Sequence, residues 1–143
     1  MSGMRQAGQA ILKYGDLVMF FGFGWLVVGY GQRGLRWEIG LGIAATGFVL
    51  WAIARLQLGK SFAVTAQAKE LVTTGLYSRI RHPVYIFGGL GYVGLFVAWG
   101  NWILTAVFVA LQTLQFQRMR KEEKVLEEAF GEEYRRYKAR TWF

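Results

Sequence analysis

The fold of this chain is decided by one uncharged stretch, residues 83–117, which reads PVYIFGGLGYVGLFVAWGNWILTAVFVALQTLQFQ. Its 35 residues include no Asp, Glu, Lys, Arg or His. A single straight helix of that length would reach roughly 50 Å, whereas the hydrocarbon core of a bilayer is about 30 Å thick. The stretch therefore predicts two antiparallel helices. We expect the break at Gly100-Asn101, which lies between two tryptophans of the kind found at membrane interfaces.

Two further uncharged blocks precede this stretch, at 17–32 and 39–54. Each is slightly shorter than the about 17–25 residues that usually cross a bilayer, but helix tilt and local thinning absorb the difference. We therefore predict four membrane helices, at about 15–31, 38–55, 83–99 and 102–118. The whole chain, 1–143, is expected to be one all-α integral membrane domain.

The composition agrees with a membrane protein. Hydrophobic residues make up 54% of the chain and charged residues 18%, whereas about 25% is usual in a soluble domain. The chain has no cysteine, which excludes disulfides and thiolate ligands, and its single histidine argues against a typical zinc site. We therefore expect no metal.

The basic residues are sorted by loop. The N-terminal segment, the 55–82 loop and the tail from residue 118 onward carry 15 of the 17 Lys and Arg residues. With four spans these three segments lie on one side, and the positive-inside rule assigns that side to the cytoplasm. The net charge of +8 is then explained by topology and by anionic headgroups, so we expect no nucleic-acid partner.

Both termini and the two largest polar segments are thus expected in the cytoplasm. The first segment, 56–82, contains a turn signal at 73–75, Thr-Thr-Gly. The second is the tail, whose apolar residues follow helical spacing (Val125, Leu126, Ala129 and Phe130). We expect this tail helix to continue the fourth span, lie at the membrane interface and loosen near Gly131.

A hairpin of the third and fourth spans would bring two distant parts of the sequence together. His82 precedes the third span and residues 118–122 follow the fourth, so we expect them to be neighbours in space. Around this corner the sequence supplies basic, acidic and aromatic residues: Tyr77, Arg79, Arg81, His82, Tyr85, Arg118, Arg120, Lys121, Glu122 and Glu123. Pro83 suits the first turn of a helix, and the free amides of such an end attract anions.

Such a corner offers donors for a carboxylate, an acid for a cation, and aromatic faces. An amphoteric metabolite with an amino-acid end and a ring fits it, and S-adenosylmethionine is one such molecule. Many other zwitterions fit the same residues, so the residues alone leave the ligand open.

Structural alternatives exist for each of these residues. Arg79, Arg81, Arg118 and Lys121 suit ordinary membrane anchors. Arg118 and Glu122 are four residues apart on one helix and suit a simple ion pair. His82 suits a helix cap. The glycines of 88–94 favour close helix packing over a phosphate loop, since no soluble strand precedes them.

Four short motifs in order resemble a known family. They are Gly-x-Tyr, Arg-His-Pro-x-Tyr, Glu-Glu-x-x-Leu and Phe-Gly-x-x-Tyr-x-x-Tyr, in LVTTGLYSRIRHPVY and RMRKEEKVLEEAFGEEYRRYKAR. They resemble the isoprenylcysteine carboxyl methyltransferase family, which belongs to a wider group with the phospholipid N-methyltransferases. The resemblance covers about 59–140.

The resemblance implies a small all-helical membrane enzyme that binds S-adenosylmethionine at its cytoplasmic face. It implies that Leu71, Val72 and Tyr77 help to enclose the cofactor. It assigns the main binding turn to His82, Pro83, Val84 and Tyr85, and the cofactor-contacting acid to Glu122. Arg118 matches an arginine associated with the acceptor substrate. Lys69 departs from the histidine of the eukaryotic enzymes, which bears on the acceptor rather than on the cofactor.

The expected function is methyl transfer to a lipophilic acceptor that enters from the bilayer. A carboxylate acceptor needs positioning but no general base, which favours an acid over an amine. The alternatives are a phospholipid amine N-methyltransferase, a non-catalytic membrane module with the same scaffold, and a membrane reductase that uses a nicotinamide cofactor. The oligomeric state stays open.

Overall fold

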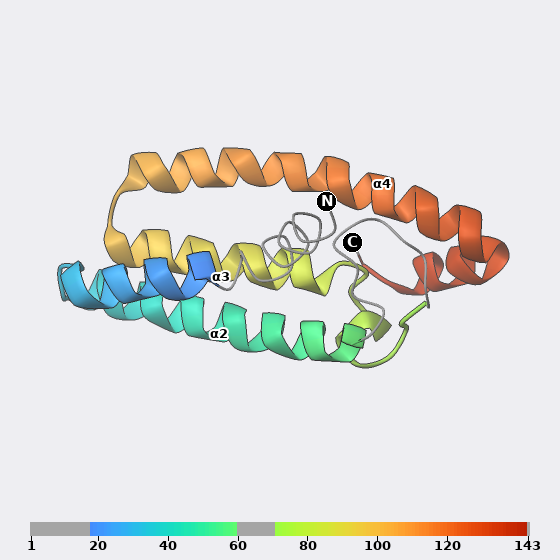
Figure 1. Ribbon diagram of the computed structural model, residues 1–143, viewed down its shortest axis with the longest axis horizontal. Helices are drawn as coiled ribbons and strands as arrows, with labels where there is room; N and C mark the ends of the chain where they lie inside the picture. Colours follow the sequence, from blue (N-terminus) through green and yellow to red (C-terminus); the bar gives the residue numbers. More distant parts are fainter. Residues whose placement is uncertain (1–17, 60–70, 143) are drawn as a thin grey trace, which may run out of the picture.

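The computed structural model describes residues 18–59 and 71–142, apart from the side chain of Arg118. These residues form an apolar helix Val18–Tyr30, then α2 (Leu35–Leu58), the short 3-10 helix η2 (Gly75–Ser78), α3 (Pro83–Trp99) and α4 (Trp102–Arg140) (Figure 1). The one β-interaction among the described residues is a parallel bridge between Ile80 and Trp142. The all-α prediction is confirmed for this part of the chain.

The hairpin of α3 and α4 turns where the sequence predicts. Gly100 ends α3 in the left-handed region with φ 80°, and its amide donates to the carbonyl of Phe96 at 3.0 Å. Asn101 begins α4, and its side-chain oxygen accepts a hydrogen bond from the Leu104 amide at 3.0 Å. A residue that tolerates positive φ followed by a capping residue produces the reversal.

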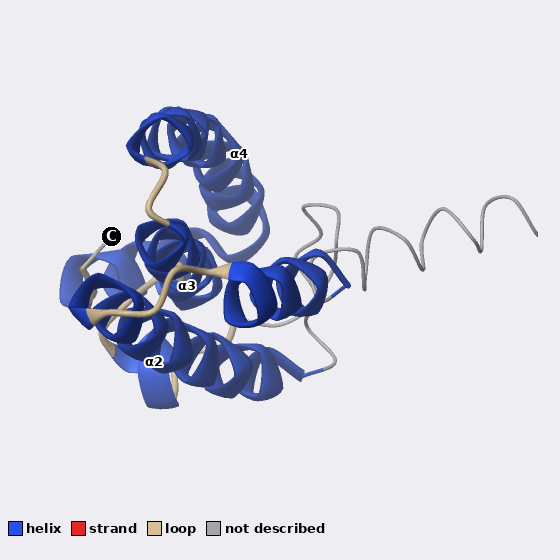
Figure 2. Cartoon of the chain, turned by 90° about the vertical axis from the view of Figure 1, so that its left-hand side faces the viewer, coloured by secondary structure: helices blue, strands red, loops and turns tan. Residues whose placement is uncertain are grey.

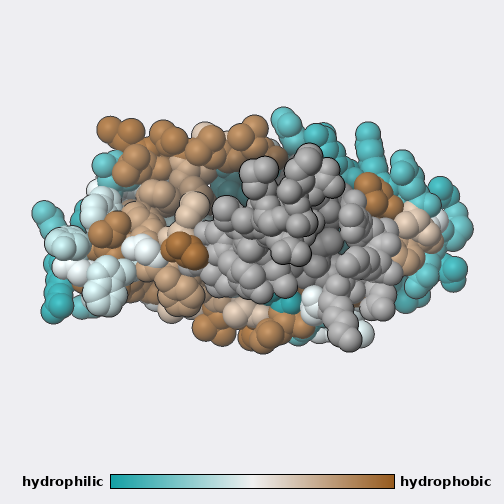
Figure 3. Space-filling view, viewed as in Figure 1, coloured by the Kyte–Doolittle hydropathy of each residue, from teal (hydrophilic) through white to brown (hydrophobic). Residues whose placement is uncertain are grey.

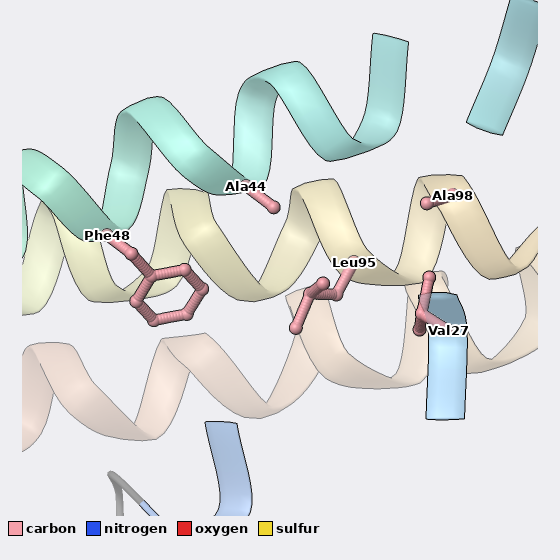
Figure 4. Packing of buried hydrophobic residues seen from close by; sticks show 5 residues of the cluster. All are labelled: Val27, Ala44, Phe48, Leu95 and Ala98. Atoms are coloured by element: carbon pink, nitrogen blue, oxygen red, sulfur yellow. The ribbon is translucent and has the colours of Figure 1, made fainter. Parts of the chain in front are cut away.

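α2 and α3 pack closely through small residues. A Cβ added at Gly47 would meet backbone atoms of Gly91, and one added at Gly94 would meet the backbone of Ala44. The predicted packing role of the 88–94 glycines is therefore confirmed. The buried apolar cluster at this interface includes Val27 of the first helix together with Ala44, Phe48, Leu95 and Ala98 (Figure 4).

This packing predicts that alanine substitutions at two glycines of α2 change the stability of the protein by different amounts. We expect Gly47→Ala to destabilise the protein by about 2 kcal/mol, because its Cβ would press on backbone atoms that cannot rotate away. Gly42→Ala places its Cβ in open space, so it should be neutral or stabilise the helix by about 0.5–1 kcal/mol. Thermal unfolding in detergent measures both, and equal effects of the two changes would contradict this packing.

α3 lies between α2 and α4 when the molecule is seen along its helices (Figure 2). α4 meets α3 mainly through Phe108, whose ring lies 5.6 Å from that of Tyr92 and 5.1 Å from that of Phe96. The outer face of the first half of α4 is exposed and apolar, with Ile103 at 77% and Leu114 at 57%. Figure 3 shows hydrophobic residues over this half and hydrophilic residues at the end where α4 turns back.

The predicted spans correspond to helices, but their lengths differ. Among the described residues, α2 is the one helix long and apolar enough to cross a membrane by itself, whereas Val18–Tyr30 and α3 are shorter apolar helices. The first three residues of the expected span 15–31 lie outside the described residues. α4 runs without a break from the expected fourth span into the tail.

Gly131 reverses the chain near the end of α4. Its φ of 49° and ψ of −119° interrupt the helix, and the segment 132–140 folds back (Figure 1). The end of the chain then returns to the start of α3, where the Trp142 amide donates to the Arg79 carbonyl at 2.6 Å. The predicted loosening at Gly131 is therefore a sharp turn that carries the tail to the candidate site. We call residues 132–142 the returning segment.

Candidate functional site

Glu123 lies at the centre of a cluster built from three parts of the chain. Its Oε1 is 3.3 Å from Nε2 of His82 and 3.1 Å from Nε of Arg81. Its Oε2 accepts a hydrogen bond from Nζ of Lys138 at 2.9 Å. The loop before α3, the middle of α4 and the returning segment therefore meet at one carboxylate. This confirms the prediction that the two ends of the hairpin are neighbours.

His82 is the N-cap residue of α3, but its side chain is held inside this cluster and does not cap the helix. It stands at the N-terminus of α3, yet its side chain caps no backbone amide and is only 6% exposed. Burial lowers its pKa below the ordinary value of 6.5, although the nearby charges of Glu122 and Glu123 oppose that shift. The imidazole is therefore neutral near pH 7. Because Nε2 faces a carboxylate it carries the proton, and Nδ1 keeps its lone pair.

Glu123 is ionised in this setting. Burial by itself would raise its pKa, but hydrogen bonds from Lys138 and His82 and the charge of Arg81 outweigh burial and lower it. A carboxylate that stays charged, beside a neutral imidazole and two fixed cations, makes a rigid corner with a defined charge pattern.

The buried His82 predicts a loss of stability on mild acidification. Because its pKa in the folded protein lies below the ordinary 6.5, the unfolded chain takes up the proton first, and stability falls as the pH drops through that value. We expect the melting temperature to fall between about pH 7.5 and about pH 5.5, and to fall less in His82→Gln. The contribution of Glu123 is lost only at lower pH, since its ordinary pKa is 4.5. A melting temperature that is flat across this range would contradict the assignment.

The returning segment fastens the loop that carries His82. The Tyr137 hydroxyl donates to the carbonyl of Tyr77 at 2.7 Å, and an Arg81 guanidinium N–H donates to the carbonyl of Lys138 at 3.1 Å. Burial raises the pKa of Tyr137 to about 12, so its hydroxyl stays a donor at neutral pH. Neither Tyr137 nor Lys138 was among the predicted site residues. The sequence feature that could have indicated this role is the Tyr-x-x-Tyr spacing just after a turn-forming glycine.

Two buried donors in this corner have no acceptor among the described residues. They are Nε of Arg81, which is near Glu123 but outside hydrogen-bond geometry, and the hydroxyl of Tyr134. Tyr134 is only 1% exposed, and its charge environment includes Glu123 and Arg81. Buried donors without partners are rare in folded proteins, so this pair marks a place where an anionic group or a water is expected.

The predicted binding turn is compact. His82 and Tyr85 lie edge to face with ring centres 5.9 Å apart, Pro83 is fully buried and Val84 is half-buried. The His82 carbonyl accepts hydrogen bonds from the amides of Tyr85 and Ile86, both at 3.1 Å. The expected free amides of this helix end are reduced, because Pro83 has no N–H and the Tyr85 amide donates to the His82 carbonyl. The Val84 amide alone keeps that role in the first turn.

The other predicted residues surround this turn. Tyr77 is buried in η2, and Leu71 and Val72 are half-buried in the segment that leads to it. Glu122 is half-buried beside the cluster, where its charge acts on both His82 and Tyr77, while the direct contact with His82 belongs to Glu123. Arg118 lies on α4, one turn before Glu122, and its side chain is outside the described part of the chain.

The end of α2 also supports the site. Gly75 has φ 62°, and the Gln57 side chain lies against it, where a Cβ would otherwise stand. The Leu76 amide donates to Oε1 of Gln57 at 2.8 Å, which ties η2 to α2. The turn at 73–75 was predicted from the sequence, whereas no role was predicted for Gln57, because nothing in its local sequence indicates this partner.

Comparisons with known proteins agree with this arrangement. The family model for phospholipid methyltransferases matches residues 35–133, most of the chain. The protein-S-isoprenylcysteine O-methyltransferase of Schizosaccharomyces pombe is 32% identical over 107 residues, which cover 71% of this chain and 45% of that protein. The phosphatidylethanolamine N-methyltransferase of Zygosaccharomyces rouxii is 32% identical over 89 residues, which cover 57% of this chain and 11% of that protein.

The chain thus spans less than half the length of either relative. The matched region contains the hairpin, the His82 turn and Glu122-Glu123, which are two of the three parts that build the cluster, whereas Lys138 of the returning segment lies beyond it. The resemblance inferred from the four motifs is confirmed. This chain belongs to the phospholipid methyltransferase family.

Proposed function

We propose that this protein transfers a methyl group from S-adenosylmethionine to the carboxylate of a lipophilic acceptor held in the membrane. The observation that carries the proposal is the contact of His82 with Glu123, which joins the motif before α3 to the motif on α4. Two motifs 41 residues apart in sequence thereby form one polar corner beside apolar helices.

The residues of this corner fit the amino-acid end of S-adenosylmethionine. Since Arg81, His82 and Lys138 already hold Glu123, Glu122 is the acid left to meet the cofactor's ammonium group. The Val84 amide and the buried Tyr134 hydroxyl, which has no acceptor among the described residues, suit its carboxylate. We further propose that Tyr77, Tyr85, Leu71 and Val72 enclose the rest of the cofactor, with His82 and Pro83 shaping the turn.

Methyl transfer to a carboxylate requires no general acid or base from the protein. When bound, S-adenosylmethionine would supply a methyl group on a sulfonium, with S-adenosylhomocysteine as the leaving group, so transfer to a carboxylate oxygen would require no proton to move. The residues of the chain must therefore hold the acceptor in line and keep water out. The half-buried and buried residues of the His82 turn suit both tasks.

A carboxylate acceptor matches the charge of this corner. Arg81 and Lys138 contact Glu123 in this corner, and further basic residues adjoin its two motifs in sequence (Arg79, Arg120 and Lys121). Such a surface attracts anions. We propose that Arg118, one turn from Glu122, orients the acceptor carboxylate through paired N–H donors.

We also propose that the four apolar helical segments cross the membrane, with both termini and the site in the cytoplasm. The exposed apolar side chains of the first half of α4 and of α2 support this arrangement, because such surfaces suit lipid. The site then lies at the membrane edge, where an acceptor enters sideways from the bilayer.

A phospholipid amine is the second candidate acceptor, and one observation favours it. An amine must lose a proton to become a nucleophile, and neutral His82 keeps a lone pair on Nδ1 that can accept it. The matched family model bears the name of the phospholipid methyltransferases.

One experiment tests the proposal and separates the two acceptors. Membranes that contain the protein are incubated with methyl-labelled S-adenosylmethionine, and the lipid extract is treated with base. A methyl ester releases labelled methanol, whereas an N-methyl group stays on the lipid. We expect base-labile label that is absent with Arg118→Ala. Base-stable label would support the amine, and no label above control membranes would contradict both and favour a non-catalytic module.

A further inference from the structure

We propose that Gln112 and Gln115 form a hydrogen-bonding subsite for carbonyl groups of the acceptor, at a level of α4 where its chain passes toward the bilayer. The inference rests on the proposed methyl transfer to a lipophilic acceptor and names a chemical feature of that acceptor. Its starting point is the uncharged first half of α4, in which glutamines interrupt an otherwise apolar sequence.

Gln112 lies on the face of α4 that is turned toward α3. Phe108 marks this face through its contacts with Tyr92 and Phe96. One turn later, the amide nitrogen of Gln112 lies over Gly89, in the space that a side chain there would fill. Positions three and four apart share a helix face, so Gln115 continues the same face toward the Glu122-Glu123 pair.

Neither amide has a partner within the part of the chain that the structure describes. Gln112 and Gln115 are both half-buried, and neither makes a hydrogen bond to a described residue. Neither side chain is sealed from its surroundings, unlike the buried donors on Arg81 and Tyr134. Figure 3 shows a hollow beneath the first half of α4 with a hydrophilic floor. Polar groups on an inward helix face in a membrane protein are usually hydrogen-bonded, so we expect a ligand to hydrogen-bond to these two amides.

Their distance from the charged corner indicates which part of the acceptor they meet. With a rise of about 1.5 Å per residue, Gln115 lies about 10 Å and Gln112 about 15 Å along the helix from Glu122. If the methylated atom sits at the corner, the amides meet the acceptor about 10–15 Å further along. In a glycerolipid the ester carbonyls lie at that distance from the end of the head group. In an isoprenoid thioether this part is bare hydrocarbon.

The amides therefore favour an acceptor with ester or amide carbonyls between its head group and its hydrocarbon chains. Each side-chain N–H can donate to a carbonyl oxygen, and the apolar surroundings strengthen that hydrogen bond. A second copy of α4 is the other partner that paired amides attract in a membrane, and the test below distinguishes the two.

The test uses two lipids that differ only in their carbonyls. The purified protein is given diacyl phosphatidylserine or the dialkyl ether analogue, whose shared head group offers both a carboxylate and an amine. Native mass spectrometry measures the bound lipid, and methyl transfer is measured in parallel. We expect wild-type protein to retain the diacyl lipid about tenfold better, as expected for one or two hydrogen bonds.

The variants assign that preference to the two amides. Gln112→Leu/Gln115→Leu should lose it, while Gln117→Leu, an exposed glutamine on the opposite face, should keep it. The single variant Gln115→Leu should show an intermediate preference, and circular dichroism confirms that each variant is helical.

Each contrary outcome has a clear meaning. Equal retention of the two lipids by wild-type protein, or an unchanged preference in the double variant, would overturn the subsite. A dimer that becomes monomeric in the double variant, with an unchanged lipid preference, would overturn it too and assign the amides to helix association. Lipid preference without any methyl transfer would instead contradict the proposed function and leave the subsite standing.

Discussion

Glu123→Ala is expected to destabilise the protein by about 3 kcal/mol and to abolish cofactor binding. Glu123 is 18% exposed and holds Arg81, His82 and Lys138 at distances between 2.9 and 3.3 Å. Its removal leaves two partly buried cations without a counter-ion and frees the loop from the returning segment. Thermal unfolding in detergent should show a melting temperature lower by about 5–10 °C.

The matched control is Glu127→Ala, one turn further along α4. Glu127 pairs with Arg135 at 3.1 Å, but the two side chains are 42% and 60% exposed. Solvent screens such a pair, so its loss should cost less than about 1 kcal/mol. Similar losses for Glu123→Ala and Glu127→Ala would mean that the cluster does not hold the corner together.

Glu122→Ala is expected to leave the fold intact and to weaken binding of S-adenosylhomocysteine about 100-fold, or about 2.7 kcal/mol. Glu122 is half-buried and its charge reaches His82 and Tyr77, yet Glu123 makes the contacts that hold the cluster. The loss thus falls on the ligand's ammonium group rather than on the protein. Isothermal titration calorimetry measures the affinity, and the melting temperature without ligand checks the fold.

Glu128→Ala serves as the control, since that carboxylate is exposed on another face of α4. Its affinity should equal that of the wild type. If Glu122→Ala bound S-adenosylhomocysteine as tightly as Glu128→Ala, the ammonium site would lie elsewhere. Glu122→Ala is therefore expected to lose ligand affinity alone, whereas Glu123→Ala should lose both stability and ligand binding.

The hairpin could be predicted because its causes are local. An uncharged run too long for one span must turn, and Gly100-Asn101 offers a left-handed residue followed by a helix cap. Gly131 was recognised by the same reasoning, since a glycine in an amphipathic helix invites a break. The meeting of His82 with the acidic pair then followed from the antiparallel geometry.

Which of the two glutamates, Glu122 or Glu123, contacts His82 could not be predicted in this way. Adjacent residues on a helix point about 100° apart, so the contact depends on how α4 is rotated against α3. That rotation is set by Phe108 against Tyr92 and by Gln112 over Gly89, contacts between residues far apart in sequence.

The returning segment and Gln57 escaped prediction for the same reason. The direction of the chain after Gly131 depends on a backbone reversal that brings Trp142 to Arg79. Gln57 meets Leu76 across 19 residues of sequence. Both support the site through hydrogen bonds to backbone atoms of distant residues. Such bonds leave no pattern of residue types in the sequence.

The most direct test of the central claim is to locate the methyl donor on the chain. Ultraviolet cross-linking of methyl-labelled S-adenosylmethionine to the purified protein, followed by peptide mapping, reports which segments surround it. We expect label in the peptide that contains 77–85 and in the peptide that contains Glu122, with both signals suppressed by excess S-adenosylhomocysteine. Label confined to the Gly100 end of the hairpin, or no label that S-adenosylhomocysteine suppresses, would contradict the account.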